Sequence, residues 1–328
     1  MPALAVDELT VTVARGGARY PAVDGISFEV ATGRAVGLVG ESGSGKSLTL
    51  RALMSVLPSA ARMEGGTVRL GGTKLPPATD GRDLRKALRG QMAMIFQDPL
   101  SALNPVQTVG EQIAEVPRRV RGLSRRQSLE RAIELLRLVG IPDPARRSRA
   151  YPHQLSGGMR QRVLIAIALA AEPAVLLCDE PTTALDVTVQ AQVLELLDDL
   201  RRRLSLAIVF VSHDLAVVRQ LCEDICVMYT GKLVERGVTT EVLERPLHPY
   251  TLGLLGAIVD LDDPVGALTP IPGSLPDLER LPAGCSFHPR CFLATPECAA
   301  ALPELATTAG APPTHTAACL HRDRMLAR

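Results

Sequence analysis

The chain contains no tryptophan, and aromatic residues make up only 3% of its 328 residues. Proteins that hold single-stranded nucleic acid stack its bases on aromatic side chains, so this scarcity argues against such a surface. The 36 basic residues nearly balance the 35 acidic ones, so no strong overall field attracts nucleic acid or anionic lipid. We therefore expect no nucleic-acid partner.

Long apolar runs and a secretory signal are also missing. The longest apolar run, residues 163–171, is far shorter than the roughly 20 residues that a helix needs to cross a bilayer. Residues 1–13 lack a basic segment followed by an apolar core. These features predict a soluble, cytoplasmic chain.

Short apolar runs alternate with helical patterns along most of the chain. Five runs have the composition of strands buried on both faces of a mostly parallel sheet: 35–39, 92–96, 174–178, 207–211 and 225–229. Segments such as 187–204 are patterned as helices between them. This βα alternation predicts an α/β fold.

Two regions depart from the alternation. Residues 106–150 are rich in Arg, Glu and Leu, show helical periodicity over 128–139 and contain no convincing strand. We interpret them as a helical subdomain that continues into a helix over 156–171 and is inserted into a core of residues 1–105 and 151–258. From residue 259 to 328 Pro, Gly and Cys dominate, which predicts a small extension that needs a covalent or metal staple.

A glycine-rich loop follows the strand expected at 35–39. Its sequence, Gly40-Glu41-Ser42-Gly43-Ser44-Gly45-Lys46-Ser47, matches the phosphate-loop pattern Gly-x4-Gly-Lys-Ser, and a helical pattern begins at Leu48. Glycines let successive backbone N–H groups face an anion, and the helix N-terminus adds to the attraction. Lys46 would contact the β- and γ-phosphates and Ser47 would bind Mg²⁺. The loop predicts a site for ATP and Mg²⁺.

Two acidic residues follow the apolar run 174–178. Asp179 at the end of a buried strand can hold Mg²⁺ through water, and Glu180 can polarise an attacking water. Such a pair carries weight only because the phosphate loop precedes it.

Further motifs resemble the ATPases of ABC transporters over nearly the whole chain. They are the phosphate loop, Gln97 after a strand, the segment Leu155-Ser156-Gly157-Gly158-Met159-Arg160-Gln161-Arg162, Asp179-Glu180, the Ala184-Leu185-Asp186 loop, and His213 after another strand. The resemblance implies a P-loop NTPase core with a mixed sheet. It also implies a head-to-tail dimer in which each nucleotide is shared between two subunits.

The resemblance assigns roles to single residues. Glu180 is similar to the general base, His213 to the γ-phosphate sensor, and Gln97 to the residue that links Mg²⁺ and the attacking water to the helical subdomain. Ser156 and Gly158 are similar to the residues that touch the γ-phosphate held by the partner, and Asp186 to an Asp at the dimer interface. Tyr20 is either an adenine-stacking residue or an ordinary surface tyrosine. The nucleotide site would thus comprise residues 40–48, Tyr20, Ser156, Gly157, Gly158 and Asp186.

Several segments resemble one branch of these ATPases, the oligopeptide and dipeptide importers. They are Gly40-Glu41-Ser42, residues 96–105, residues 245–251, residues 271–276 and Cys285-Ser286-Phe287-His288-Pro289-Arg290-Cys291. Such a chain would drive solute uptake from the cytoplasmic face of the membrane, with a second, different ATPase subunit, two permease subunits and a solute-binding protein as partners. Nickel or another solute, and a soluble ABC ATPase without a transport role, remain alternatives.

The seven cysteines are distributed unevenly. Cys178, Cys222 and Cys226 lie in apolar stretches and are expected to be small buried residues. The other four, Cys285, Cys291, Cys298 and Cys319, favour a metal site over disulfides in a reducing cytosol. Four thiolates can bind a [4Fe–4S] cluster or zinc; the resemblance favours the cluster, with zinc and free thiols as alternatives. His288, His315 and His321 are either substitute ligands or solvated.

Overall fold

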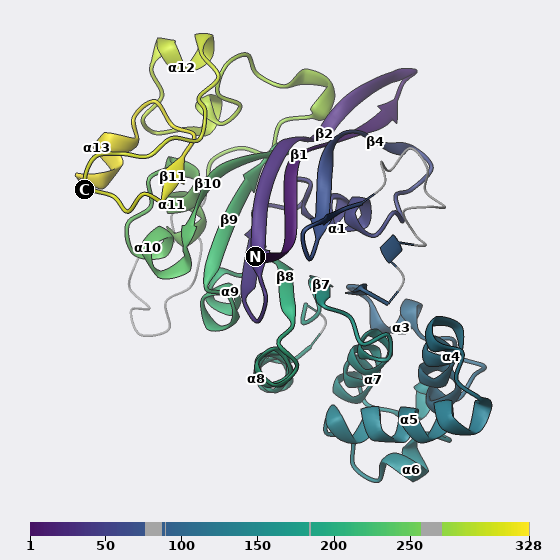
Figure 1. The fold of residues 1–328 in the computed structure, drawn as a ribbon. Coiled ribbons are helices and arrows are strands. Elements are labelled where there is room, and N and C mark those ends of the chain that lie inside the picture. The colour runs from purple at the N-terminus through teal and green to yellow at the C-terminus, as the bar shows by residue number, and fades with distance from the viewer. Residues whose placement is uncertain (76–86, 89, 184, 257–270, 328) are drawn as a thin grey trace. The chain divides into compact units, whose positions relative to one another are not determined.

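The computed structural model describes residues 1–75, 87–88, 90–183, 185–256 and 271–327. The chain divides into two compact units. The first contains residues 1–4, 30–34 and 70–209, and the second contains residues 5–29, 35–69 and 210–328. The strands β1 (Pro2–Arg15), β2 (Ala18–Ala31), β4 (Ala61–Leu70) and β8 (Ala207–Ser212) run from one unit into the other. Figure 1 colours the chain from its N-terminus to its C-terminus and labels most of its elements.

The first unit joins a helical group to a pair of parallel strands. Strands β6 (Met92–Ile95) and β7 (Val175–Asp179) pair in parallel, with Met92 opposite Val175. All five residues of β7 are buried, as expected for a strand covered on both faces. The remaining elements are β5 (Thr73–Lys74), α3 (Pro99–Ala102), α4 (Val109–Arg121), α5 (Arg125–Leu138), α6 (Pro144–Arg147), the 3-10 helix η1 (Pro152–Gln154), α7 (Gly157–Leu169) and α8 (Val187–Leu204).

Helices α4, α5 and α7 pack on one another, and local signals explain where each begins. The side chain of Thr108 caps α4 by accepting the Glu111 N–H, and Ser124 forms a capping box with Gln127 at the start of α5. A glycine with positive φ, Gly122, ends α4 and allows the short connection. The helical character expected for residues 106–150 is confirmed in this way.

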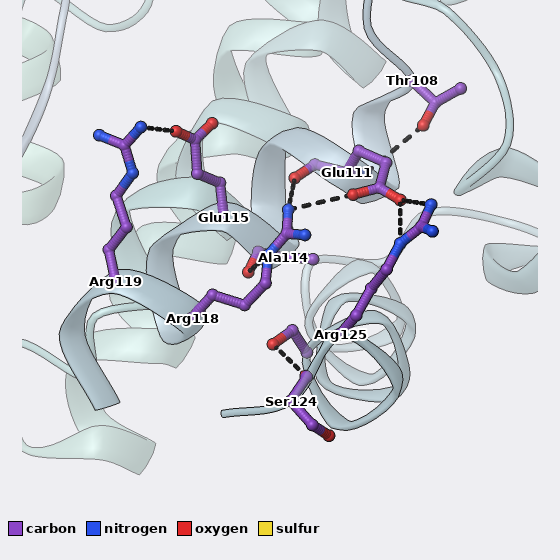
Figure 2. A network of polar contacts seen from close by, with 9 residues as sticks. Thr108, Glu111, Ala114, Glu115, Arg118, Arg119, Ser124 and Arg125 are labelled. Atoms are coloured by element: carbon purple, nitrogen blue, oxygen red, sulfur yellow. Dashed lines mark hydrogen bonds and ion pairs between the residues drawn. The ribbon is translucent and has the colours of Figure 1, made fainter. Parts of the chain in front are cut away.

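An ion-pair network ties α4 to the start of α5 (Figure 2). The carboxylate of Glu111 accepts hydrogen bonds from Arg118 (3.0 Å) and from Arg125 (2.8 Å). The hydrogen bond from Arg125, together with the charges of both arginines, lowers the pKa of Glu111 although burial opposes the shift. Glu115 and Arg119 form a separate pair on the same helix.

The second unit contains the phosphate loop and the cysteine-rich extension. Strand β3 (Ala35–Val39) is wholly buried and pairs in parallel with β9 (Asp224–Tyr229). Antiparallel strands follow: β10 (Lys232–Val238) beside β9, and β11 (Thr316–Ala317) beside β10. The sheet is therefore mixed. The remaining elements are α1 (Lys46–Leu53), α9 (Leu215–Leu221), α10 (Thr239–Glu244), α11 (Pro249–Gly256), η2 (Leu278–Arg280), η3 (His288–Arg290), α12 (Pro296–Ala300) and α13 (Arg322–Leu326).

The five strands expected from apolar runs are present, shifted by a residue or less at most ends. The long strands β1 and β2, which are neighbours in a sheet of order β2-β1-β4-β5, were not expected. Within the described ranges, none of the helices is long and apolar enough to cross a membrane.

Candidate nucleotide site

The phosphate loop has a backbone that only glycine permits at two positions. Gly40 and Gly45 have φ values of 146° and 106°, a region that other residues avoid. A Cβ atom at Gly40 would lie 2.2 Å from the carbonyl oxygen of Met228, and one at Gly45 would lie 2.6 Å from that of Ala22. The glycines therefore let the loop turn tightly against its own unit. Gly45 is also the N-cap of α1 and offers the first-turn N–H groups no side-chain acceptor, as is typical of a helix that binds an anion.

Lys46 lies inside the loop. Its side chain is buried, and its ammonium group donates to the carbonyl oxygens of Gly40 (2.7 Å) and Glu41 (2.9 Å) and lies 3.4 Å from the Ser44 hydroxyl. These contacts place one positive charge at the centre of the curled backbone. A positive charge held within a glycine-rich turn at the start of a helix is the arrangement expected of a phosphate-binding loop. Ser47 follows on the first turn of α1.

Two residues of the C-terminal region contact the loop at Glu41. The hydroxyl of Tyr250 accepts a hydrogen bond from the Glu41 N–H at 2.7 Å. The guanidinium of Arg290 forms a two-point ion pair with the Glu41 carboxylate at 2.7 and 2.9 Å. Burial raises the pKa of Tyr250, so its hydroxyl stays protonated. The sequence assigned no role to either residue.

In the first unit, the candidate general base lies next to the candidate linking residue. The side-chain N–H of Gln97 donates to the Glu180 carboxylate at 3.2 Å, and the Thr183 hydroxyl donates to the same oxygen at 3.0 Å. Glu180 has a φ of 46°, which is uncommon for a residue with a side chain and is found at functional sites. Asp179, at the end of β7, is 2% exposed. At the end of β7 the carboxylate of Asp179 is therefore buried, and that of the next residue, Glu180, is partly exposed.

The segment 156–158 begins helix α7. Ser156 is exposed and caps the helix by accepting the Met159 N–H. Gly158 packs so closely on α8 that an added Cβ would lie 2.6 Å from the side chain of Val189. Asp186 caps α8 by accepting the Val189 N–H at 2.9 Å. Ser156 and Asp186 both cap a helix, and both are exposed, so a partner molecule can reach them.

Three further candidates are placed individually. His213 is exposed and directly follows β8, ahead of the Asp214 cap of α9, and it belongs to the same unit as the phosphate loop. Tyr20 is half-buried in β2, two residues before Ala22, whose carbonyl faces Gly45. Ala184 of the predicted 184–186 loop lies outside the described residues.

The four cysteines of the extension come from separate segments, and none of them forms a disulfide. The Leu293 N–H donates to the sulfur of Cys291 at 3.4 Å, and the His321 N–H donates to that of Cys319 at 3.3 Å. Burial raises the pKa of Cys291 and of Cys319, that of Cys319 to about 12, and the charges of the neighbouring cysteines raise both further. The thiols are therefore near enough to influence one another electrostatically.

The three histidines considered as ligands have different surroundings. His315 is buried and its Nε2 lies 2.7 Å from the equally buried carboxylate of Glu235, so the expectation that it is solvated is wrong. His321 lies 3.6 Å from the Cys298 sulfur, whereas His288 contacts the backbone of Cys285. Within the ranges described above, no group of three or more His, Cys, Asp or Glu side chains is gathered so as to hold a metal ion.

Comparison with known proteins agrees with this geometry. The family profile described as "ABC transporter" matches residues 23–183, and that of the "oligopeptide/dipeptide transporter, C-terminal region" matches residues 234–298. A putative peptide import ATP-binding protein of Brucella abortus is 48% identical over 309 residues, which cover 94% of this chain and 93% of that protein. The chain belongs to the ABC transporter family. It is an ABC ATPase with the C-terminal region found in oligopeptide and dipeptide transporters.

Other relatives of this ABC ATPase extend the comparison. The oligopeptide transport ATP-binding protein OppD of Salmonella typhimurium is 44% identical, covering 88% of this chain and 85% of that protein. The OppD protein of Mycobacterium bovis is 47% identical, covering all of this chain but 53% of that protein. A solved dimer of an ATP-binding cassette in a post-hydrolysis state with ADP and phosphate matches with a TM-score of 0.63 and 29% identity, covering 72% of this chain and 98% of that one.

Proposed function

We propose that this ABC ATPase powers the uptake of dipeptides or oligopeptides across the cytoplasmic membrane. The observation that supports the proposal is the combination, in one chain, of the ATPase core with the C-terminal region of the oligopeptide and dipeptide transporters. The relatives named as peptide import and oligopeptide transport proteins support the same solute class. That C-terminal region also favours transport over a soluble, non-transport role.

In the proposed mechanism the loop N–H groups and Lys46 would bind the phosphates of ATP. Ser47 in the second unit, and Gln97 and Asp179 in the first, are the residues that the family resemblance assigns to Mg²⁺. Glu180 polarises the attacking water and is oriented by its hydrogen bonds to Gln97 and Thr183. His213 contacts the γ-phosphate. Binding of ATP favours the closed state of a dimer, and hydrolysis releases it.

The partner in this dimer is a second, homologous ATPase subunit. Ser156 and Gly158 lie at the start of α7, where a helix N-terminus attracts the γ-phosphate held by the partner. Asp186 belongs to the same interface. Two permease subunits bind the dimer at the cytoplasmic face, and a solute-binding protein delivers the peptide.

The catalytic part of the proposal is tested by Glu180→Gln. Gln keeps the size of the side chain but removes the base, so ATP hydrolysis should fall by about 10² to 10⁴-fold while ATP still binds. Glu172→Gln is the matched control, because Glu172 also has a positive φ (55°) and pairs with an arginine. Unchanged hydrolysis in Glu180→Gln would refute the assignment of the base.

The transport part is tested by reconstituting the chain in proteoliposomes with whatever permease and solute-binding proteins its neighbouring genes encode. Stimulation of ATP hydrolysis and uptake by peptides supports the proposal. Stimulation by Ni²⁺ but not by peptides would assign the nickel alternative. Failure of the chain to associate with any permease would favour the soluble role.

We also propose that Cys285, Cys291, Cys298 and Cys319 hold a [4Fe–4S] cluster. Main-chain N–H groups point at the sulfurs of Cys291 and Cys319, an arrangement that stabilises thiolate charge. A single zinc ion would draw four thiolates around one point, whereas a cluster distributes them over four irons. The cluster, when bound, supplies a cross-link between four segments of the extension.

Iron, sulfide and zinc analysis of anaerobically purified protein tests this second proposal. Four irons per chain, with the charge-transfer absorbance of a cluster, are the expected result. One zinc per chain would assign the zinc alternative, and the absence of both metals would leave four free thiols and overturn the proposal.

A further inference from the structure

Glu41 is the point at which the phosphate loop meets the C-terminal region. Its carboxylate pairs with Arg290, and its N–H donates to the Tyr250 hydroxyl. Its carbonyl oxygen accepts a hydrogen bond from Lys46. One residue of the loop is therefore held at its side chain, its N–H and its carbonyl group at once.

Arg290 is itself held in a fixed position. Its side chain is 5% exposed, and its guanidinium lies 5.9 Å from the ring centre of Tyr229 and 6.0 Å from that of Phe287. Its Nε donates to the Pro272 carbonyl at 2.8 Å. Of its remaining donors, two contact the Glu41 carboxylate, one the Tyr229 hydroxyl (3.4 Å) and one the Gly273 carbonyl (3.5 Å). This set uses all five N–H donors of an arginine, which a lysine cannot replace.

The backbone conformation at Arg290 is held by hydrogen bonds within the cysteine-rich segment. Arg290 ends the one-turn helix η3, and its N–H donates to the carbonyl of Phe287 at 3.0 Å. Cys285 and Cys291 bracket this turn: the His288 N–H donates to the Cys285 carbonyl, and the Cys291 N–H donates to that of His288. The direction of Arg290 thus depends on how the two cysteines are held.

A second contact from the same region lies against the loop. A Cβ built on Gly43 would lie 3.3 Å from the side chain of Leu275, two residues after Gly273, a partner of Arg290. The extension therefore reaches the loop both through the charged pair at Glu41 and through an apolar side chain at Gly43.

We propose that Arg290 is a positioning residue of the nucleotide site, through which the C-terminal extension holds the phosphate loop in its ATP-binding shape. A shift of Glu41 would move the carbonyl that Lys46 contacts and that also accepts the Ser44 N–H, so the backbone of the loop would move with it. Phosphate affinity depends on the preorganisation of these groups. Arg290 does not touch ATP in this proposal; it acts through Glu41.

The test is the affinity of the full chain for ATP, measured by calorimetry, in Arg290→Lys and Glu41→Gln. Arg290→Lys keeps the charge but loses the two-point pair, and Glu41→Gln keeps the size but loses the charge. We expect each to weaken ATP binding about tenfold or more, with a raised KM and a kcat changed less than threefold. The double variant Arg290→Lys with Glu41→Gln should bind ATP no more weakly than whichever of the two single variants binds it more weakly.

Arg15→Gln is the matched control, because Arg15 also pairs with the extension, through Asp277 at 3.4 Å, and both side chains are exposed. It should bind ATP within twofold of the wild type. Thermal unfolding of each variant identifies the temperature range in which it is folded. Wild-type affinity in both Arg290→Lys and Glu41→Gln within that range would overturn the proposal.

This inference rests on the loop being the ATP site, which Lys46→Ala tests separately. Loss of ATP binding in Lys46→Ala, combined with wild-type binding in the two Glu41–Arg290 variants, would overturn the role of Arg290 alone. Retained ATP binding in Lys46→Ala would instead contradict the site itself.

Discussion

His248 should make the stability of this protein depend on pH in the mildly acidic range. The residue precedes α11 and is 1% exposed. Its Nδ1 accepts the Tyr250 N–H at 3.1 Å, and its ring lies 5.6 Å from that of Phe287. Burial lowers the pKa of His248 to about 3. Protonation in the folded state would both charge a buried ring and remove the acceptor for Tyr250.

The sign and size of the effect follow from the two pKa values. Above pH 6.5 the imidazole is neutral in the folded and the unfolded chain, and it makes no difference to stability. As pH falls below 6.5, the unfolded chain binds a proton that the folded chain does not, so unfolding becomes easier. The loss is about 2 kcal/mol at pH 5 and approaches a limit of about 5 kcal/mol near pH 3, from a total stability of about 5–15 kcal/mol.

Guanidinium unfolding at pH 8 and pH 5 measures this loss in the wild type and in His248→Asn. Circular dichroism is the suitable signal, because the chain has no tryptophan. Asn keeps an acceptor for the Tyr250 N–H but does not titrate. Between pH 8 and pH 5 the free energy of unfolding of His248→Asn should therefore fall by about 2 kcal/mol less than that of the wild type. His153→Asn, at an exposed histidine, is the control and should behave as the wild type. Equal losses in the wild type and His248→Asn would refute the reasoning.

Three other outcomes are expected. Gly45→Ala should weaken ATP binding about 10- to 100-fold through strain and a backbone clash, whereas Gly17→Ala, also at positive φ (85°) but with open space around it, should not. Arg125 and Arg118 lower the pKa of Glu111, so the stability gained from these ion pairs is present above pH 4.5 and is lost as pH falls below it. In thermal melts Glu111→Gln should remove that acid sensitivity. Removing the iron of the proposed cluster with a chelator, with Mg²⁺ restored before the assay, should weaken ATP binding, measured by calorimetry, in the wild type but not in Arg290→Gln. Equal weakening of ATP binding in both proteins would show that the metal does not act on the phosphate loop through Arg290.

The parts of the fold that the sequence predicted are those specified locally. The strand at 35–39 and the helix at 187–204 have the expected bounds, because a run buried on both faces must be apolar throughout and because Asp186 caps the helix. The β1 and β2 strands have no such uniform pattern: buried, half-buried and exposed residues follow one another irregularly along them. Strand β11 has two residues, too few for any periodicity, and only its pairing with β10 defines it.

In the candidate site, too, the residues close together in the sequence could be predicted and those far apart could not. The glycines and Lys46 could be predicted because the loop chemistry depends on residues within eight positions of one another. The pair of Glu41 with Arg290 joins residues 249 positions apart, and no spacing rule indicates such a contact. Its signal in the sequence is indirect: both residues belong to segments that resemble the oligopeptide and dipeptide importers.

Those segments have a physical connection in the structure. Residues 40–42 contain Glu41, residues 245–251 contain Tyr250, and residues 285–291 contain Arg290. The second and third segments both contact Glu41: Tyr250 accepts its N–H, and Arg290 donates to its carboxylate. The Arg290 side chain is 5% exposed and that of Glu41 is 29% exposed, so loss of Glu41 would leave a buried guanidinium without its carboxylate, at less than the about 3–5 kcal/mol of a fully buried pair. The three segments are therefore joined through Glu41, which is the contact that the proposed role of Arg290 requires.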